Sequence, residues 1–500
     1  RNPNKYRTRT RSKWEAYNYR RGVVMLNHRN VYRSALAMIA ACLSIVAFRA
    51  APAEAAPQGE QVVAGEASFT RDGAQTIIEA ANNTIIDYQS FDIGLGEAVR
   101  FIQPTDQARV LNRVLDARAT VIDGTLTANG RVYLVNPSGI MFGDQAIVDV
   151  GHLTAAAGNM SNSDFLAGVN RFTGLGGEVT NRGLIRGRNV DLIGQHVQNF
   201  GSIVVDDGMV TMLAGDEVYL GDGQSPVLVK VSDAGDGEGD DGTTRPGVHN
   251  AGTVRAGSGK VVMGAADAYA LAIRHSGEAR ARQIKLSGPD GQVQVTGLLD
   301  ASDEAWAAEN RRGGTVHVLG REVVVAGDAV VDASGDQGGG KIRIGGDLRG
   351  EGTLYTAEYT YVGPDVTIDA STGSNGDGGT AIVWADIATA FFGAVDVRGG
   401  GAVDHGGFVE ISGAQYLTAD GVYQIGPGGT LLFDPAVIEI RGGIADGNDD
   451  TASNNSYFES EELVIDNAGF NFGIVPLDDY NAFNPFVVYE SEIEGEFVTP

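Results

Sequence analysis

The chain has 500 residues, with 71 Gly, only 14 Pro and 43% hydrophobic residues. Collagen requires Gly at every third position with abundant Pro, and intrinsic disorder requires far fewer apolar residues, so this composition excludes both classes. The net charge is −27, although residues 1–55 contain eleven Lys or Arg against two Glu. The rest of the chain is therefore more acidic still, which excludes nucleic acid as a partner held by charge.

Residues 1–55 predict an extended signal peptide. A long basic segment is followed by an apolar run from Ala35 to Phe48 and then by the small-x-small sequence Ala53-Glu54-Ala55. Basic, apolar and small residues in this order are typical of a secretory signal, and cleavage is expected after Ala55. The apolar run is shorter than the ~20 residues that a membrane-spanning helix needs.

The one cysteine of the chain, Cys42, lies inside this signal. Cleavage after Ala55 would leave a mature chain without disulfides or a nucleophilic thiol. The sequence Ile39-Ala40-Ala41-Cys42 also fits a lipoprotein signal, which is the alternative interpretation. An exported chain without disulfides has to obtain its stability from buried apolar surface and backbone pairing.

From about residue 120 the sequence repeats itself. Asn-x-Gly segments at Asn181, Asn199 and Asn250 are each flanked by short runs in which apolar and polar residues alternate, and the first two lie 18 residues apart. Such runs predict strands with one buried face, and Asn and Gly are expected to turn the chain because both tolerate positive φ. A unit this short cannot bury its own apolar face, so copies must stack. The sequence therefore predicts an all-β fold, a right-handed parallel β-helix (a solenoid) with an N-terminal cap.

A second repeat begins near residue 298. Each copy has a strand that ends in an aspartate, and a Gly-Gly pair opens the next strand; the aspartates are Asp300, Asp332, Asp369 and Asp396. We expect each Asp to cap a turn and the variable loops to lie on one side of the solenoid. A ladder of calcium ions is the alternative, although the Gly-Gly-x-Gly-x-Asp repeat of calcium-binding β-rolls is absent.

Between about Gln61 and Leu220 several short motifs follow one another in a fixed order. They are Phe101-Ile102-Gln103-Pro104, Val110-Leu111-Asn112-Arg113-Val114, Ile122-Asp123-Gly124, Ala128-Asn129-Gly130 and Val132-Tyr133-Leu134-Val135-Asn136-Pro137-Ser138-Gly139-Ile140. In this order the motifs resemble the haemagglutination-activity domain of two-partner secretion exoproteins of the filamentous-haemagglutinin type. The later repeats are similar to the β-helical stem of such proteins.

The resemblance implies a division of the mature chain into three parts. Residues 56–230 would be the secretion domain and residues 231–440 the β-helical stem. Residues 441–500 form an acidic, irregular segment that is expected to continue in a longer protein.

The resemblance also implies a secretion motif, made of Asn112, Arg113, Asn136, Pro137, Ser138 and Gly139. The family pattern at the last four positions is Asn-Pro-Asn-Gly, and Ser138 replaces the second Asn. All four residue types favour tight turns, so the segment is either a turn needed for folding or an element recognised during export, and both roles are compatible.

The resemblance further implies the partner and the location. In this family the exoprotein crosses the outer membrane unfolded, through a dedicated β-barrel transporter with periplasmic domains, and then folds outside the cell. We therefore expect an adhesin-like protein that is secreted or displayed on the surface of a Gram-negative-type bacterium. Its ligand on a host or neighbouring cell is not named by the sequence.

Catalysis is not expected. The His residues have no metal-ligand spacing and no Gly-x-Ser-x-Gly segment forms a convincing nucleophile elbow, so the sequence predicts no catalytic residue, metal or cofactor. Parallel β-helices also host enzymes that act on polysaccharides, which keeps that function open as an alternative. The carrier portion of a secreted toxin or haemolysin is a further alternative.

Overall fold

A computed structural model describes residues 57–220, 228–230, 245–266, 270–305, 311–401 and 405–434, with further strands at 438–441, 463–466 and 486–489. The chain divides into two units, Arg1–Ala53 and Glu54–Pro500. The first unit lies outside the described residues, as do Ala53 and Ala55 of the expected cleavage site. No helix within the described ranges is long and apolar enough to cross a bilayer.

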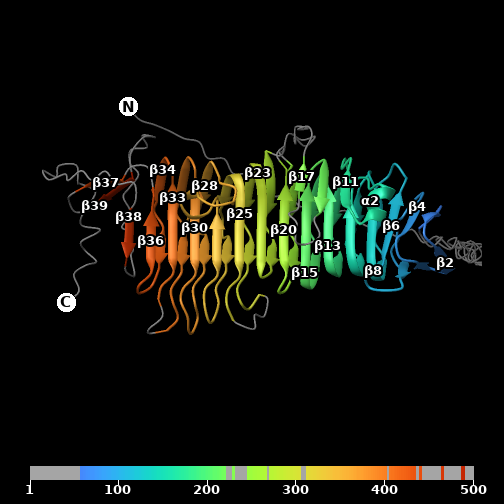
Figure 1. Ribbon diagram of the computed structural model, residues 1–500, viewed down its shortest axis with the longest axis horizontal. Helices are drawn as coiled ribbons and strands as arrows, with labels where there is room; N and C mark the ends of the chain where they lie inside the picture. The colour runs from blue at the N-terminus through green and yellow to red at the C-terminus, as the bar shows by residue number, and fades with distance from the viewer. Residues whose placement is uncertain are drawn as a thin grey trace, which may run out of the picture. The chain divides into compact units, whose positions relative to one another are not determined.

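The second unit is a coil of parallel strands with three faces, and 34 strands form one connected sheet (Figure 1). Face A contains β1 (Gln61–Ala64), β4 (Thr84–Tyr88), β6 (Arg109–Val114), the later parts of β8 (Thr125–Val135), β10 (Ile147–Ala156), β13 (Leu184–Gly194) and β15 (Ser202–Ala214), then β20 (Lys260–Ala265), the first parts of β23 (Gln283–Val295) and β25 (Thr315–Val325), β27 (Lys341–Ile344), β30 (Thr380–Ala385), β33 (Phe408–Gly413), β36 (Thr430–Phe433) and β38 (Leu463–Asp466).

The other two faces are built in the same way. Face B contains β7 (Thr120–Ile122), β9 (Ile140–Phe142), β12 (Glu178–Asn181), β14 (His196–Asn199), β18 (Val248–Asn250), β21 (Leu271–His275), the ends of β23 and β25, β28 (Tyr359–Val362), β31 (Ala388–Phe391) and β34 (Tyr416–Ala419). Face C contains β2 (Ala67–Asp72), β3 (Gln75–Ala80), β5 (Ala98–Ile102), the first parts of β8, β10, β13 and β15, then β19 (Thr253–Arg255), β22 (Glu278–Arg280), β24 (Leu298–Asp300), β26 (Val330–Asp332), β29 (Thr367–Asp369), β32 (Ala394–Asp396) and β35 (Val422–Gln424).

Short elements outside the coil complete the described chain. They are α2 (Asn162–Ala167), the 3-10 helix η1 (Leu348–Gly350), a sheet of β11 (Asn170–Thr173), β16 (Glu217–Leu220) and β17 (Leu228–Lys230), and the pair β37 (Ile438–Arg441) and β39 (Phe486–Tyr489). The predicted all-β solenoid with almost no helix is confirmed.

The N-terminal end of the coil is closed by antiparallel strands. β1 runs antiparallel to β4 on face A, and β2 runs antiparallel to β3 on face C, whereas β4 and β3 pair in parallel with the next rung. An antiparallel strand reverses the chain at the edge of a sheet and covers the hydrogen-bonding groups of the first rung. The expected N-terminal cap is therefore present.

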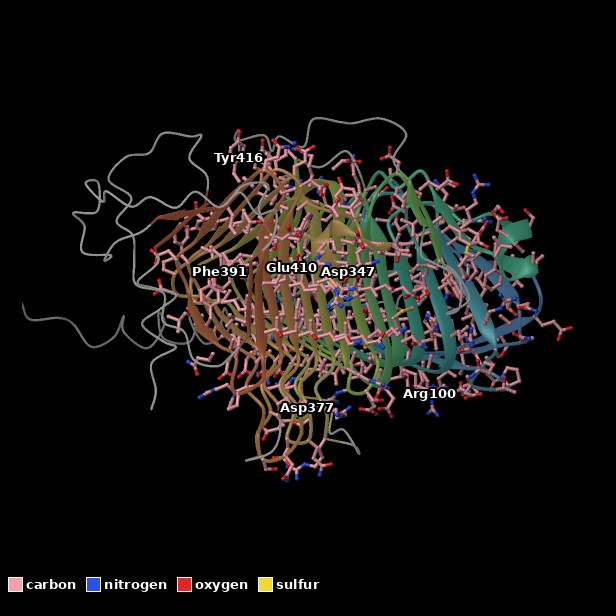
Figure 2. The ribbon with its side chains drawn as sticks, turned by 60° about the vertical axis from the view of Figure 1, so that its left-hand side comes forward. Arg100, Asp347, Asp377, Phe391, Glu410 and Tyr416 are labelled. Atoms are coloured by element: carbon pink, nitrogen blue, oxygen red, sulfur yellow. The ribbon has the colours of Figure 1, made fainter. Side chains whose placement is uncertain are left out.

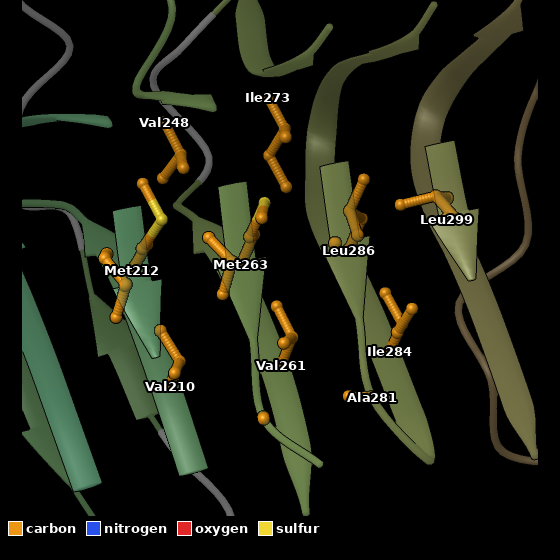
Figure 3. Packing of buried hydrophobic residues seen from close by; sticks show 14 of the residues in the cluster. Val210, Met212, Val248, Val261, Met263, Ile273, Ala281, Ile284, Leu286 and Leu299 are labelled. Carbon is orange, nitrogen blue, oxygen red and sulfur yellow. The ribbon is translucent and has the colours of Figure 1, made fainter. Parts of the chain in front are cut away.

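The interior of the coil is filled by apolar side chains that repeat from rung to rung. On face A, matching positions of β15, β20 and β23 carry Val210, Val261 and Ile284, all of them buried (Figure 3). Full burial of one such side chain stabilises the fold by about 1.5–3 kcal/mol. Stacking of short units therefore supplies the core that a single unit lacks.

A ladder of buried amides runs along face B. Asn181, Asn199 and Asn250 are register partners in successive strands, and His275 takes the next position. Nδ2 of Asn181 donates to Oδ1 of Asn199 over 2.8 Å, and Nδ2 of Asn199 donates to Oδ1 of Asn250 over 2.7 Å. Nδ1 of His275 lies 3.2 Å from Nδ2 of Asn250, and its Nε2 lies 3.0 Å from the carbonyl oxygen of Leu298. The predicted 18-residue repeat is thus a true step from rung to rung.

The expected reason for the Asn-x-Gly pattern was wrong. Neither Gly201 nor Gly252 has a positive φ. A Cβ atom at Gly201 would instead lie 2.2 Å from the carbonyl oxygen of Gly183 in the neighbouring rung, and Gly252 meets Gly201 in the same way. Glycine is required there because successive turns stack in direct backbone contact.

The aspartates of the second repeat cap turns, as expected. Asp300, Asp332, Asp369 and Asp396 are register partners on face C. The Oδ1 atom of each accepts the backbone N–H two residues later over 2.7–3.0 Å. The loops that follow project from one side of the coil, and one of them carries Asp377 (Figures 1 and 2). No group of three or more His, Cys, Asp or Glu in the described ranges is arranged to hold a metal ion.

The variant Asp332→Asn is expected to be as stable as the unchanged chain at pH 7, or more stable. Burial, with the charges of Asp369 and Asp300, raises the pKa of Asp332. A carboxyl whose pKa is raised in the folded state contributes less to stability when it is ionised than when it is neutral. Asn at position 332 cannot ionise, and it keeps the oxygen that accepts the N–H of Ser334. Urea unfolding at pH 7 and pH 4 measures this, and the advantage should disappear at the lower pH.

The matched control is Asp396→Asn, because Asp396 forms an exposed ion pair with Arg398 over 2.5 Å. That variant should be neutral or slightly destabilised at pH 7. A clear loss of stability in Asp332→Asn at pH 7 would contradict the prediction.

Candidate secretion-motif site

Asn112 lies on β6 and its side chain is completely buried. The hydroxyl of Tyr88 in the preceding rung donates to its Oδ1 over 3.1 Å, and its Nδ2 donates to the carbonyl oxygen of Tyr133 in the following rung over 3.1 Å. Burial raises the pKa of Tyr88 well above its ordinary value, so the hydroxyl stays a donor. Asn112 therefore joins three successive rungs of face A.

Arg113, the next residue, points to the outside of face A. Its guanidinium binds the Asp87 carboxylate through two hydrogen bonds of 2.9 and 3.1 Å, a geometry in which both partners are held in one orientation. Its Nη1 also donates to Oδ1 of Asn162 over 2.9 Å. Arg113 thus ties the rung next to the cap to helix α2, which lies outside the coil.

The predicted turn is formed by Asn136, Pro137, Ser138 and Gly139 between β8 and β9. The N–H of Gly139 donates to the carbonyl oxygen of Asn136 over 3.0 Å, and the N–H of Ser138 donates to Oδ1 of Asn136 over 2.9 Å. Gly139 has a φ of 113°, which L residues with a side chain rarely adopt. The four residues therefore form a tight turn, as their types favour, and Gly139 supplies its positive φ.

The side chain of Asn136 reaches beyond its own turn. It is fully buried, and its Nδ2 donates to the carbonyl oxygen of Arg118 over 2.9 Å and to Oγ1 of Thr120 over 3.0 Å. The hydroxyl of Ser138 donates to the carbonyl oxygen of Asp116 over 3.3 Å. Both side chains bind the turn that leads into β7, so they fix the spacing of two rungs.

The structure brings the six predicted residues together. Asn112 is the register partner of Leu134, and Arg113 is the register partner of Val135, the residue before the Asn136 turn. The motif is therefore one patch of two adjacent rungs close to the N-terminal cap.

Sequence reasoning missed a layer that covers this part of face A. It consists of α2, β11 and β16, and β11 pairs antiparallel with β16 from Asn170–Leu220 to Thr173–Glu217. Ser161 caps the N-terminus of α2, since its Oγ accepts the N–H of Asp164 over 3.0 Å. That cap sequence was the available signal, since Ser followed three residues later by Asp favours a helix start.

The layer and face A enclose a second hydrophobic core, separate from the interior of the coil. Its buried members are Ile85, Leu111, Tyr133, Val135, Ala156, Met160, Phe165, Phe172, Leu175, Ile193, Leu213, Val218 and Leu220. Phe165 of α2 meets the ring of Tyr133 edge to face at 5.4 Å, and the guanidinium of Arg109 lies over its ring at 5.1 Å. We call this group the outer core.

The variant Phe165→Ala is expected to lose about 3–5 kcal/mol of stability, the usual cost of emptying a buried aromatic site. The loss should be confined to the outer layer, because the interior of the coil does not contain Phe165. Limited proteolysis should therefore cut between 157 and 178 in the variant, while the coil stays resistant. Leu166→Ala is the control, since Leu166 is 48% exposed in the same helix; equal sensitivity of both variants would contradict the prediction.

The comparisons with known proteins agree with this geometry. The model of the TPS secretion domain matches residues 50–297. A heme/hemopexin-binding protein of Haemophilus influenzae is 34% identical over 172 residues, which are 33% of this chain and 19% of that protein. A second Haemophilus influenzae protein of the same name is 40% identical over 101 residues, or 20% of this chain and 11% of that protein. The chain thus spans about a fifth of the length of the curated relatives it matches, or less.

Among solved structures, the crystal structure of the HMW1 secretion domain from Haemophilus influenzae aligns with a TM-score of 0.65 at 30% identity. The alignment covers 73% of this chain and 97% of that one. Secretion domains of this kind are right-handed β-helices, so the expected handedness is confirmed. The chain belongs to the two-partner secretion (TPS) exoproteins, which are secreted or surface-associated in Gram-negative bacteria.

Proposed function

We propose that residues 56–230 direct this chain across the outer membrane through a dedicated β-barrel transporter with periplasmic domains. The observation that carries the proposal is the match of residues 50–297 to the TPS secretion domain. Within that domain the six residues of the secretion motif act through the register of the early rungs. Residues 1–55 are the cleaved signal, with Ala53 and Ala55 at the cleavage site.

Residues 231–440 are an adhesin stem in this proposal. The described part of that range is an almost uninterrupted stack of rungs with loops projecting on one side, which suits a rigid spacer better than an enclosed active site (Figure 1). The matched curated relatives bind heme or hemopexin, but only 19% of the first is shared, so the common property is export rather than that ligand.

The test is secretion of residues 1–500 from a Gram-negative host with and without a TPS transporter. The chain is expected in the medium only when the transporter is present, and its N-terminal sequence should begin at Ala56. Release of the same amount without the transporter would overturn the proposal. Degradation of pectin-like polymers by the purified chain would favour the polysaccharide-acting enzyme instead.

A further inference from the structure

Glu410 is a charged residue type at a fully buried position in the stem. It lies on β33 between the core residues Val409 and Ile411, so its side chain points out of face A, yet its exposure is 0%. Residues 345–352, which include η1, contact its carboxylate. Both carboxylate oxygens of Glu410 accept the backbone N–H of Arg349 in that segment, over 3.0 and 3.1 Å.

The covering segment lies flat on an indole ring. A Cβ atom at Gly346 would lie 2.8 Å from the ring of Trp384, and one at Gly350 would lie 2.6 Å from it. Trp384 is on β30, one rung before Glu410, and keeps only 6% of its surface exposed. The segment therefore contacts face A through glycine backbone and through the carboxylate of Glu410.

The backbone of the segment is strained. Arg349 has a φ of 55°, which costs free energy in a residue with a side chain, and Gly345 and Gly352 also have positive φ. The segment is anchored at its start, where Arg343 binds Asp347 over 2.5 Å. At its centre the backbone N–H of Arg349 donates to Glu410, and the guanidinium of Arg349 lies 3.9 Å from the carboxylate of Asp434.

We propose that residues 345–352 are a flap whose closure over Trp384 depends on the charge of Glu410. The charged groups that act on Glu410 are Asp434, which repels its ionised form, and Arg349, which attracts it; Ser412 on the same strand adds a hydrogen bond. The flap excludes water from the carboxyl group, and this favours the neutral form. An open flap would return the group to water, where ionisation is easy.

The direction of the pH dependence follows from the cost of burial. Burial, with the charge of Asp434, raises the pKa of Glu410 from 4.5 to about 7 in the closed form. Closure is then strongest below pH 4.5, weakens as the pH rises toward 7, and is constant above that. A shift of this size corresponds to a decrease in the closing constant of about 300-fold.

Hydrogen exchange of the full mature chain tests the flap. Peptides from 345–358 should lose protection, after correction for intrinsic rates, by up to about 300-fold between pH 4.5 and pH 8. In Glu410→Gln the same peptides should show no such trend. Glu351→Gln is the matched control, because Glu351 is an exposed glutamate in the same segment and should behave like the unchanged chain.

Two further measurements keep the proposal testable if Glu410→Gln fails to fold. Asp434→Asn removes the repelling charge together with the ion pair to Arg349, so the flap should be less protected at every pH, while its pH dependence shrinks and moves to lower pH. In a Trp306→Phe background, acrylamide should quench Trp384 more strongly at pH 8 than at pH 5. Protection of the flap that does not change with pH, or that changes equally in Glu410→Gln, would overturn the proposal.

Discussion

The variant Asn136→Ile is expected to be absent from the culture medium, whereas Asn375→Ile is secreted like the unchanged chain. Isoleucine at 136 leaves the carbonyl of Arg118, the hydroxyl of Thr120 and the N–H of Ser138 without their partner. One of these hydrogen bonds is buried and the other two are partly buried, so the loss should be about 1–3 kcal/mol. It falls on an early rung, where folding outside the cell is expected to begin.

Asn375 is the control because it lies in an exposed loop of the stem, far along the chain. Its backbone N–H bonds to the carbonyl oxygen of Asp336, and a change of side chain leaves that bond in place. The measurement is the amount of each variant in the medium, with urea unfolding of the purified chains beside it. Equal secretion of the two variants would show that the Asn136 turn has no special role in export.

Between pH 6.5 and pH 4 the unchanged chain should lose about 3 kcal/mol of stability that His275→Asn retains. Burial lowers the pKa of His275 to about 4. A histidine with a lowered pKa in the folded state contributes stability above its unfolded pKa, and this is lost as the pH falls through the folded value. Protonation also places a second N–H on the ring, facing Nδ2 of Asn250, which is itself a donor.

Asparagine fits at position 275 because the ladder repeats. Nδ2 of Asn250 lies 3.3 Å from the carbonyl oxygen of Glu278, which is three residues after His275, the register partner of Asn250. Leu298 is likewise three residues after Val295, the register partner of His275. The measurement is urea unfolding at pH 7.5 and pH 4.5. His405→Asn, at an exposed histidine, is the control, and an equal acid loss in His275→Asn and the unchanged chain would contradict the prediction.

The parts of the fold that the sequence could predict are those set by neighbours along the chain. Alternating apolar and polar residues predicted the strands, the spacing of Asn181 and Asn199 predicted the step between rungs, and the Asn136–Gly139 segment predicted a tight turn. Each of these depends on the conformation of a few consecutive residues or on a regular repeat. The stacked turns at Gly201 were predicted for the wrong reason, because their constraint comes from a different rung.

The parts that could not be predicted depend on contacts between distant segments. Arg113 was expected to belong to the site, but its partners Asp87 and Asn162 are 26 and 49 residues away. The outer layer interrupts the repeat, and its strand β11 finds its partner β16 only in three dimensions. The burial of Glu410 could not be predicted from its neighbours in the sequence, since the segment that contacts its carboxylate lies 61 residues earlier.

The outer core has a consequence for the timing of export. Its members begin at Ile85 and end at Leu220, and the pairing of Asn170 with Leu220 fastens the layer. A chain that emerges N-terminus first can add rungs to the coil one by one, but the strip of Ile85, Leu111 and Tyr133 is fully covered only when the chain has emerged as far as Leu220. The domain therefore gains stability in two stages, gradually while the coil grows and then abruptly with one late segment. A partly exported domain therefore exposes apolar surface on face A that the complete domain buries.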